Sequence, residues 1–332
     1  MSLEDRLVHY GDLKPCLNAF IDTRSPGSER KENFTIIGPG VSENPEQYVH
    51  ISIPHGFNIG GARQPPGCLN SQHSHLTAEV FLVHSGTWAF RTGEHASDGE
   101  IILQEGDVIS LPTDVFRGFE NVGDDEGYLF AILGGDDPGR VMWAPSVFDM
   151  AENYGLILLD DGSLVDIAIG QTVPKGKIPM PRTSAEQVAS LRIINSEQLN
   201  GIVIRSSDYQ WSDNTALSAF DGVREAALLG PASPAEKTPT ANLSWPHEFV
   251  FRALEFQPGA TISPHKRLEE EVIFVLKGTL SLQVDGECLK LGRGDVFTTP
   301  IGSIRSFTNN TQQSSLVYIV RREDQPAAPQ FV

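Results

Sequence analysis

Two histidines and a glutamate at close spacing are the residues of this chain best suited to chemistry. His73 and His75 are separated by one residue, and Glu79 follows four residues later. Because side chains alternate along a strand, the three residues share one parity and are expected to point the same way. Two imidazoles and a carboxylate are good ligands for Fe(II), Mn(II), Ni(II), Cu(II) or Zn(II), and the ligand types alone do not choose among these metals. We therefore expect a divalent transition metal at His73, His75 and Glu79.

Arg117 is the fourth candidate at this site, but it cannot bind a metal. A guanidinium group stays protonated, with a pKa above about 12, and has no lone pair to offer. Arg117 therefore either orients an anionic substrate beside the metal or simply neutralises Glu79 without a metal, because a buried carboxylate needs a partner. On the first interpretation, His73, His75, Glu79 and Arg117 are the candidate catalytic residues.

A second group, His265, Arg267, Glu271 and Arg305, combines one imidazole and one carboxylate with two permanent cations. Two guanidinium groups repel a divalent ion, so no metal is expected here. One interpretation is a ligand-binding pocket, because paired arginines grip carboxylate or phosphate. The other is an internal salt-bridge cluster in which Glu269 and Glu271 are the partners.

The two groups lie in two copies of one sequence pattern. Residues 36–86 recur without a gap 192 positions later, so that His73 aligns with His265 and Glu79 with Glu271. After a shorter loop the offset becomes 188, and Arg117 aligns with Arg305. Such preserved spacing indicates an internal repeat. It predicts two domains, residues 1–165 and 166–332, each with its own core.

Each copy has the pattern of an all-β domain. In the second copy, a continuous apolar run over 272–276 predicts a buried strand, and alternation over 279–284 leads to an Asp285-Gly286 turn typical of a hairpin. The first copy repeats this pattern with a longer loop through Asp98-Gly99. Many short strands with regular turns indicate a sandwich or a barrel. Ser184 and Gln187 predict a short capped helix through Leu191.

The spacing of the conserved residue types resembles the two motifs of the cupin family. The segments that resemble the first motif are 67–86 and 259–278, and those that resemble the second are 106–121 and 294–309. The matching residues in the first copy are Gly67, His73, His75, Glu79 and Gly86, then Gly106, Pro112 and Asn121. The family usually has a ligand histidine where this chain has Arg117 and Arg305, and Arg267 replaces the second histidine of the other copy.

The resemblance implies a bicupin, that is, two tandem cupin barrels of the double-stranded β-helix or jelly-roll type with a few short helices. In such a barrel the metal-binding face is the interior. The resemblance favours a small-molecule enzyme, a metal-dependent dioxygenase or oxidoreductase acting on an aromatic or carboxylic acid. Two alternatives are a metal-free ligand-binding protein or sugar-phosphate isomerase or epimerase, with His73 as base, and a non-catalytic storage-type bicupin.

The amino-acid composition limits the classes of binding partner. A net charge of −18 and a pI near 4.8 repel phosphate backbones and anionic lipids, so neither nucleic acid nor a membrane surface is an expected partner. The expected ligand is a small, anionic molecule. The amino terminus lacks an apolar signal core, and the three cysteines form no disulfide pattern, so a cytoplasmic location is expected. Cupin barrels often associate through edge strands, and the arm at residues 1–45 is suited to that role, which predicts a homodimer.

Overall fold

The computed structural model describes residues 2–332 and divides them into two compact units. The first barrel comprises residues 14–54 and 58–203, and the second barrel comprises residues 2–13, 55–57 and 204–332. The units therefore differ from a division at residue 165. Residues 166–203 belong to the first barrel because Ile194 and Leu199 are buried in its core beside Phe81 and Phe90. Residues 2–13 belong to the second barrel.

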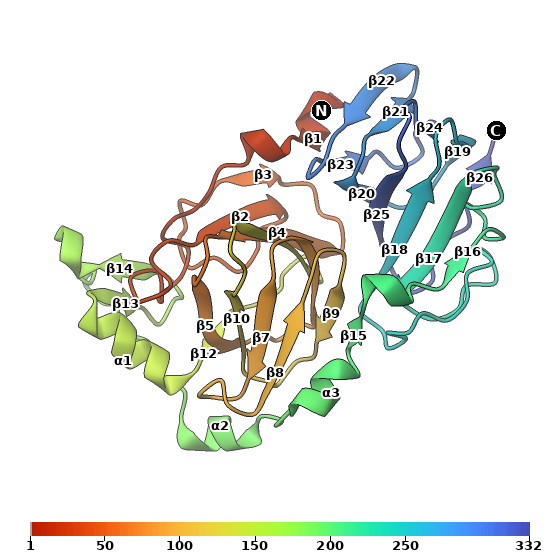
Figure 1. Ribbon diagram of the computed structural model, residues 1–332. Helices are drawn as coiled ribbons and strands as arrows, with labels where there is room; N and C mark the ends of the chain where they lie inside the picture. Colours follow the sequence, from red (N-terminus) through yellow and green to blue (C-terminus); the bar gives the residue numbers. More distant parts are fainter. Residues whose placement is uncertain (1) are drawn as a thin grey trace. The chain divides into compact units, whose positions relative to one another are not determined.

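The first barrel consists of two facing sheets (Figure 1). One sheet has the strand order β15-β9-β6-β11-β4-β2-β3, and the other has the order β12-β5-β10-β7-β8. The strands are β2 (Glu32–Ile37), β3 (Val49–Ile51), β4 (Phe57–Gln64), β5 (Leu69–Ser74), β6 (Glu79–Ser85), β7 (Trp88–Thr92), β8 (Gly99–Leu103), β9 (Val108–Leu111), β10 (Arg117–Asn121), β11 (Gly127–Gly134), β12 (Met142–Trp143) and β15 (Val203–Ile204).

The second barrel repeats this topology. Its sheets have the orders β1-β23-β20-β25-β18-β17-β16 and β22-β21-β24-β19-β26, in which the central strands follow the order of their counterparts in the first barrel. The edges differ, because β16 pairs antiparallel with β17 whereas β3 pairs parallel with β2. The strands are β1 (Leu7–Val8), β16 (Trp211–Ser212), β17 (Val223–Leu229), β18 (Phe249–Phe256), β19 (Thr261–Lys266), β20 (Glu271–Lys277), β21 (Leu280–Val284), β22 (Glu287–Leu291), β23 (Val296–Thr299), β24 (Arg305–Thr308), β25 (Ser315–Arg322) and β26 (Gln330–Phe331). The predicted all-β fold of two tandem barrels is confirmed.

The helices are short and lie between strands. They are α1 (Pro145–Asn153), α2 (Ala185–Ser190), α3 (Ser196–Asn200) and the 3-10 turns η1 (Glu4–Arg6), η2 (Tyr10–Asp12), η3 (Ile167–Ile169) and η4 (Ser206–Asp208), with a small hairpin of β13 (Leu156–Leu158) and β14 (Leu164–Asp166) after α1. The predicted cap of α2 is confirmed, because Ser184 and Gln187 each bond the other's backbone amide. Between residues 2 and 332, none of the helices has the length and apolar character needed to span a bilayer.

The hairpin predicted at Asp285-Gly286 joins β21 to β22. Both turn residues have left-handed backbone angles, with φ of 49° and 92°, which is the geometry that favours Asp-Gly in two-residue hairpins. Below this hairpin the core of the second barrel is aliphatic and aromatic. In the first barrel, Trp88 and Phe90 are fully buried in the core, as aromatic residues in barrels usually are.

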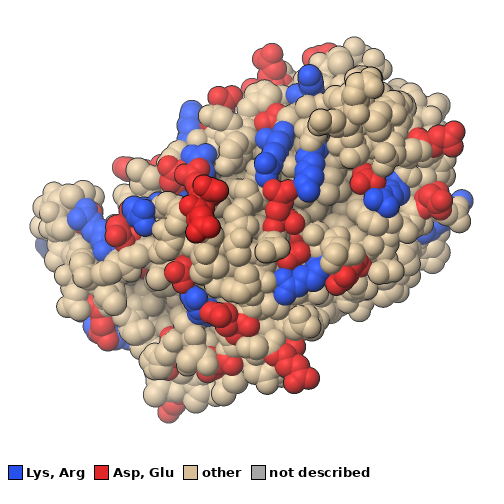
Figure 2. Space-filling model, in the orientation of Figure 1, with Lys and Arg blue, Asp and Glu red and all other residues tan. Residues whose placement is uncertain are grey.

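The amino-terminal arm is used within the chain. In the second barrel, β1 pairs with β23, with Leu7 opposite Phe297, and Arg6 lies 3.1 Å from Glu270. The arm expected to join two copies therefore pairs with a strand of its own chain, and the homodimer stays a prediction. Figure 2 shows basic and acidic side chains interspersed on the visible face, an arrangement suited to a solvated surface.

Candidate metal centre

His73 is held ready to bind a metal through one ring nitrogen. It is the fifth residue of β5, and its Nδ1 lies 2.7 Å from the carbonyl oxygen of Ser71. Only a protonated Nδ1 can donate to that carbonyl, so the Nε2 lone pair is left available, as in many metal-binding histidines. Burial, with a further contribution from Arg117, lowers the pKa of His73 to about 3. The imidazole is therefore neutral across the physiological pH range.

His75 and Glu79 complete a group of three donors. His75 follows β5 directly and Glu79 opens β6, so a turn between two strands brings the carboxylate to the histidines. The three residues therefore do not lie on one strand, as their spacing in the sequence suggested. The ligand atoms of His73, His75 and Glu79 all lie within 4.8 Å of one another, and all three residues are buried. Burial and Arg117 also lower the pKa of His75.

The donor group can close around a divalent metal by movement of its side chains. Ligand atoms about 2.1 Å from one ion lie roughly 3.0 Å apart in a facial arrangement and roughly 3.4 Å apart in a tetrahedral one. The donor atoms lie within 4.8 Å of one another, so the most distant pair has to close by up to roughly 1.8 Å, which rotation of the side chains can supply. The set offers two neutral nitrogen donors and one carboxylate, with further positions open for substrate, as in the facial triad of non-haem iron sites.

Arg117 lies beside this group without closing it. It opens β10 opposite His73, and its Nη2 lies 3.3 Å from Oε2 of Glu79. Charge-assisted bonds are usually about 2.7–2.9 Å long, so this contact is loose. Burial raises the pKa of Glu79 and Arg117 lowers it. Arg117 is fully buried and does not line the cavity, so it acts on Glu79 and is not placed to touch a substrate.

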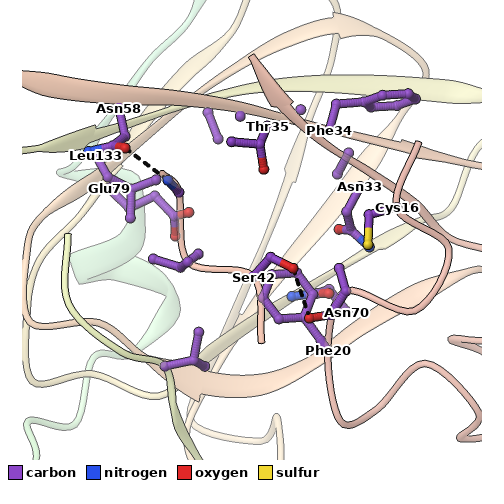
Figure 3. A pocket seen from close by; sticks show the side chains of 18 of the residues that line it. Cys16, Phe20, Asn33, Phe34, Thr35, Ser42, Asn58, Asn70, Glu79 and Leu133 are labelled. Carbon is purple, nitrogen blue, oxygen red and sulfur yellow. Dashed lines mark hydrogen bonds between the residues drawn. The ribbon is translucent and has the colours of Figure 1, made fainter. Parts of the chain in front are cut away.

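The three donors face a cavity of about 80 Å³ inside the first barrel. We call it the first-barrel cavity. Its wall combines side chains of β2, β4, β6 and β11 with residues of the segment 16–47, including Cys16, Phe20 and Ser42. In Figure 3, Asn33 and Cys16 lie on the other side of the cavity from Glu79. The segment 16–47 thus supplies part of the enclosure.

Asn33 is the polar side chain of the wall with a donor to spare. Its buried Nδ2 has no hydrogen-bond partner. By contrast, Asn58 donates to the carbonyl of Gly135 at 2.7 Å and accepts from the amide of Gly40 at 2.9 Å. A buried amide donor without a partner costs stability, so Asn33 is suited to a ligand oxygen in the cavity.

Behind the cavity lie buried ionisable groups that the sequence did not reveal. The buried pair of Lys31 and Asp22 is joined by Asn70, whose Oδ1 accepts from Lys31 at 2.8 Å. Glu43 accepts the amide of Ile21 at 2.7 Å and Nε1 of Trp143 at 2.6 Å. These residues anchor the segment 16–47, and they belong to no recognisable motif.

In the second barrel the four predicted residues come together as an ion cluster. His265 has the same ring orientation as His73, with Nδ1 2.9 Å from the carbonyl of Ser263. Arg267 lies 3.2 Å from Glu269 and 3.1 Å from Glu271, and Arg305 lies 3.4 Å from Glu271. Although burial opposes it, the arginines, Arg305 first, lower the pKa of Glu271 to about 2. The internal salt-bridge interpretation describes these contacts.

Comparison with known proteins gives the same two segments. Residues 62–133 and 253–320 match the cupin domain family. No curated protein sequence matches the chain.

Solved structures share the fold over nearly the whole chain. AerE from Microcystis aeruginosa has a TM-score of 0.51 and 13% identity, covering 95% of this chain and 98% of that one. Oxalate decarboxylase from Lactobacillus farciminis, in a formate complex, has a TM-score of 0.58 and 11% identity, covering 98% and 88%. Oxalate decarboxylase from Bacillus subtilis at pH 4.6 has a TM-score of 0.56 and 12% identity, covering 98% and 78%. At these identities the likeness concerns the fold.

Proposed function

Because the chain is a bicupin, with two cupin domains in tandem, we propose that its first barrel is a metal-dependent enzyme site for a small organic acid. The observation that carries the proposal is the convergence of His73, His75 and Glu79 at an enclosed cavity, with the lone pair of His73 aimed by its bond to Ser71. Barrel packing does not require two buried imidazoles beside a carboxylate.

The metal would be held by His73, His75 and Glu79; any of the candidate ions would supply a Lewis acid for the organic acid, and a redox-active ion such as iron or manganese would also supply dioxygen chemistry. Fe, Mn, Ni, Cu and Zn all suit these donors. One of the similar structures, of the Bacillus subtilis oxalate decarboxylase, was determined in a study of its Mn(II) centres. Manganese is therefore, with iron, among the first metals to test.

The residues of the chain would divide the remaining work. Arg117 would act as a positioning residue, because its contact with Glu79 orients that carboxyl group and opposes the rise in its pKa that burial causes. Asn33 would donate its free Nδ2 hydrogen to a substrate oxygen on the side opposite the donors. The segment 16–47 would exclude water, which strengthens every electrostatic contact within the cavity.

The volume of the first-barrel cavity limits the size of the substrate. A cavity needs about 10–15 Å³ to hold one water molecule, so the volume of about 80 Å³ has room for on the order of five to eight groups of that size. For comparison, a cavity of ~150 Å³ holds benzene. A short aliphatic carboxylic acid therefore fits the closed site better than an aromatic acid, which needs the segment 16–47 to move.

The charges of the site favour an anion once metal is bound. Glu79 and Arg117 together are neutral, so a divalent ion brings an excess of positive charge into a buried space. Such an excess is costly without a counter-ion, and a carboxylate substrate supplies one. A dioxygenase reaction needs no separate reductant, because both atoms of dioxygen enter the acid and the acid supplies the electrons.

Loss of carbon dioxide is a second candidate reaction. The observation that favours it is the small cavity, because the similar oxalate decarboxylases act, by their name, on a very small acid. The isomerase alternative is less well supported. His73 is a poor general base near neutral pH with a pKa of about 3, and none of the residues lining the cavity is a lysine or arginine that would bind phosphate.

Turnover with a panel of short acids tests the proposal. Protein loaded anaerobically with each metal would be given C2 to C4 carboxylic acids, and both oxygen uptake and carbon dioxide release would be recorded. We expect activity that is lost in His73→Ala and kept in His265→Ala, its counterpart in the second barrel. Oxygen uptake supports the dioxygenase, and carbon dioxide release without oxygen uptake supports the decarboxylase. Neither signal with any metal, or identical signals from wild type and His73→Ala, would refute an enzyme site here.

A further inference from the structure

Four positions that line the first-barrel cavity carry charged residues in the second barrel. The offsets of 192 and 188 found in the sequence connect Asn33 with Glu225, Gly60 with Arg252, His75 with Arg267, and Leu133 with Arg321. Strand pairing confirms the alignment. Glu79 lies opposite Leu133 in the first barrel, and Glu271 lies opposite Arg321 in the second.

These charged side chains occupy the interior of the second barrel. Arg252 and Arg321 are fully buried, Arg267 is 1% exposed and Glu225 is 2% exposed. Arg252 and Arg321 lie on the same face of the sheet as the apolar core residues Leu254 and Ile319, each two residues away along its strand. Two arginines thus stand where the first barrel has a glycine and a leucine beside open space.

A carboxylate from a surface segment enters this interior. Glu236 lies between β17 and β18, is 2% exposed, and places Oε1 2.5 Å from Nη1 of Arg321 and 2.9 Å from Nη1 of Arg267. Its own segment is tightly built, because Ser233 and Thr238 exchange two backbone bonds of 3.0–3.1 Å around it. Glu236 is thereby directed inward and gripped by two guanidinium groups.

The corresponding residue of the first barrel behaves differently. Asn44 occupies the equivalent position (236 − 192 = 44) in the segment that helps to enclose the first-barrel cavity. Its amide nitrogen donates to Asn18 at 2.7 Å, and it does not line the cavity. Equivalent segments thus close both barrels, and in the second barrel the segment also contributes a carboxylate.

Arg252 adds unpaired guanidinium donors to the cluster. Its Nη1 donates to the carbonyl of Leu229 at 2.5 Å, but its buried Nε and Nη2 have no hydrogen-bond partner. Nη2 of Arg267 and Nη2 of Arg321 are in the same condition. Buried guanidinium donors are best satisfied by carboxylate oxygens.

We propose that the second barrel is a carboxylate-binding pocket whose ligand is the chain's own Glu236, and that it binds a free small monocarboxylate such as acetate once that side chain is removed. In the wild type the pocket is filled, so external acids reach the first barrel alone. The proposal is independent of whether the first barrel holds a metal.

The test is a rescue experiment on Glu236→Ala with acetate as the probe. Melting temperatures of wild type, Glu236→Ala, Glu236→Gln and the double variant Glu236→Ala/Arg321→Met would be measured in sodium acetate and in sodium chloride of the same ionic strength. Glu287→Ala, which removes an exposed glutamate of β22, is the matched control.

We expect Glu236→Ala to melt well below the wild type in chloride and to regain several degrees in acetate, because a ligand that binds only the folded state raises the melting temperature. Wild type and Glu287→Ala should respond alike, and the double variant should lose the extra response of Glu236→Ala. Glu236→Gln should be destabilised without rescue, because the amide fills the space and brings N–H groups against the guanidinium groups.

Two results would overturn the proposal. One is a Glu236→Ala variant whose response to acetate does not exceed that of the wild type. The other, which holds even if Glu236→Ala fails to fold in either salt, is a Glu236→Gln variant with the melting temperature of the wild type, since a gripped carboxylate cannot be replaced by an amide without loss.

Discussion

Raising the pH from 6.5 to 8 should loosen the segment that encloses the first-barrel cavity, and Glu43 is the residue responsible. Its carboxyl group is buried, and its oxygens accept hydrogen bonds from the amide of Ile21 and from Nε1 of Trp143. Burial is the main cause that raises its pKa from 4.5 to about 8, and the hydrogen bonds from Trp143 and Ile21 oppose it in part.

The magnitude follows from the shift. The difference 8 − 4.5 is 3.5 units, and each unit corresponds to about 1.36 kcal/mol, so the protonated form contributes about 5 kcal/mol of stability. Because the folded pKa is the higher one, this stability is complete below pH 4.5 and is lost as the pH rises through about 8.

The titration of His73 decides the pH interval in which the effect of Glu43 is measured. The pKa of His73 is lowered from 6.5 to about 3, so its contribution is present above pH 6.5 and is lost as the pH falls. The two slopes oppose each other between pH 4.5 and 6.5. From pH 6.5 to 8, Glu43 acts without that opposition, and 1.5 units correspond to about 2 kcal/mol.

Urea unfolding of wild type and Glu43→Gln at pH 6.5 and pH 8 measures this contribution. We expect the wild type to lose about 2 kcal/mol more than the variant over this interval, because glutamine cannot ionise. Glu46→Gln, an exposed change in the same segment, should keep the wild-type slope. If Glu43→Gln and wild type lose the same stability, the assignment of the slope to Glu43 is wrong.

Two further changes should lower stability by amounts that the packing sets. Lys31→Met leaves the carboxylate of Asp22 buried without its cation, which should cost about 3–5 kcal/mol, and adding Asp22→Asn should recover much of the loss in urea unfolding. Gly86→Ala should cost about 1–3 kcal/mol, because the residue has a φ of 88° and its new methyl group would lie 2.8 Å from Cα of Gly127. A melting temperature unchanged by Gly86→Ala would contradict the second estimate.

The fold and the donor residues were accessible from the sequence because both depend on short-range spacing. The offsets of 192 and 188 establish the duplication, and strand alternation with turn residues indicates the barrels. The parity of His73, His75 and Glu79 singled out residues that do lie together in the structure, but the reason was incomplete. A turn between β5 and β6, not a single strand, brings Glu79 to the histidines.

The buried ionisable groups behind the cavity could not be predicted in the same way. Asp22, Lys31 and Glu43 lie in a segment without periodicity, and their burial depends on long-range contacts such as that of Glu43 with Trp143. The arginines that fill the second barrel, by contrast, can be found from the sequence. The exchange of Gly60 for Arg252 and of Leu133 for Arg321 is readable from the two offsets once the cavity wall is known.

Metal analysis of the purified protein tests the central claim most directly. Wild type, His73→Ala and His265→Ala would be reconstituted anaerobically with iron, manganese, nickel, copper and zinc in turn and then desalted. The bound metal per chain would be measured by inductively coupled plasma mass spectrometry. The account predicts about one ion per chain in the wild type and in His265→Ala, and a loss of that ion in His73→Ala. A wild-type protein that retains no transition metal, or a His73→Ala variant that retains as much as the wild type, would contradict it.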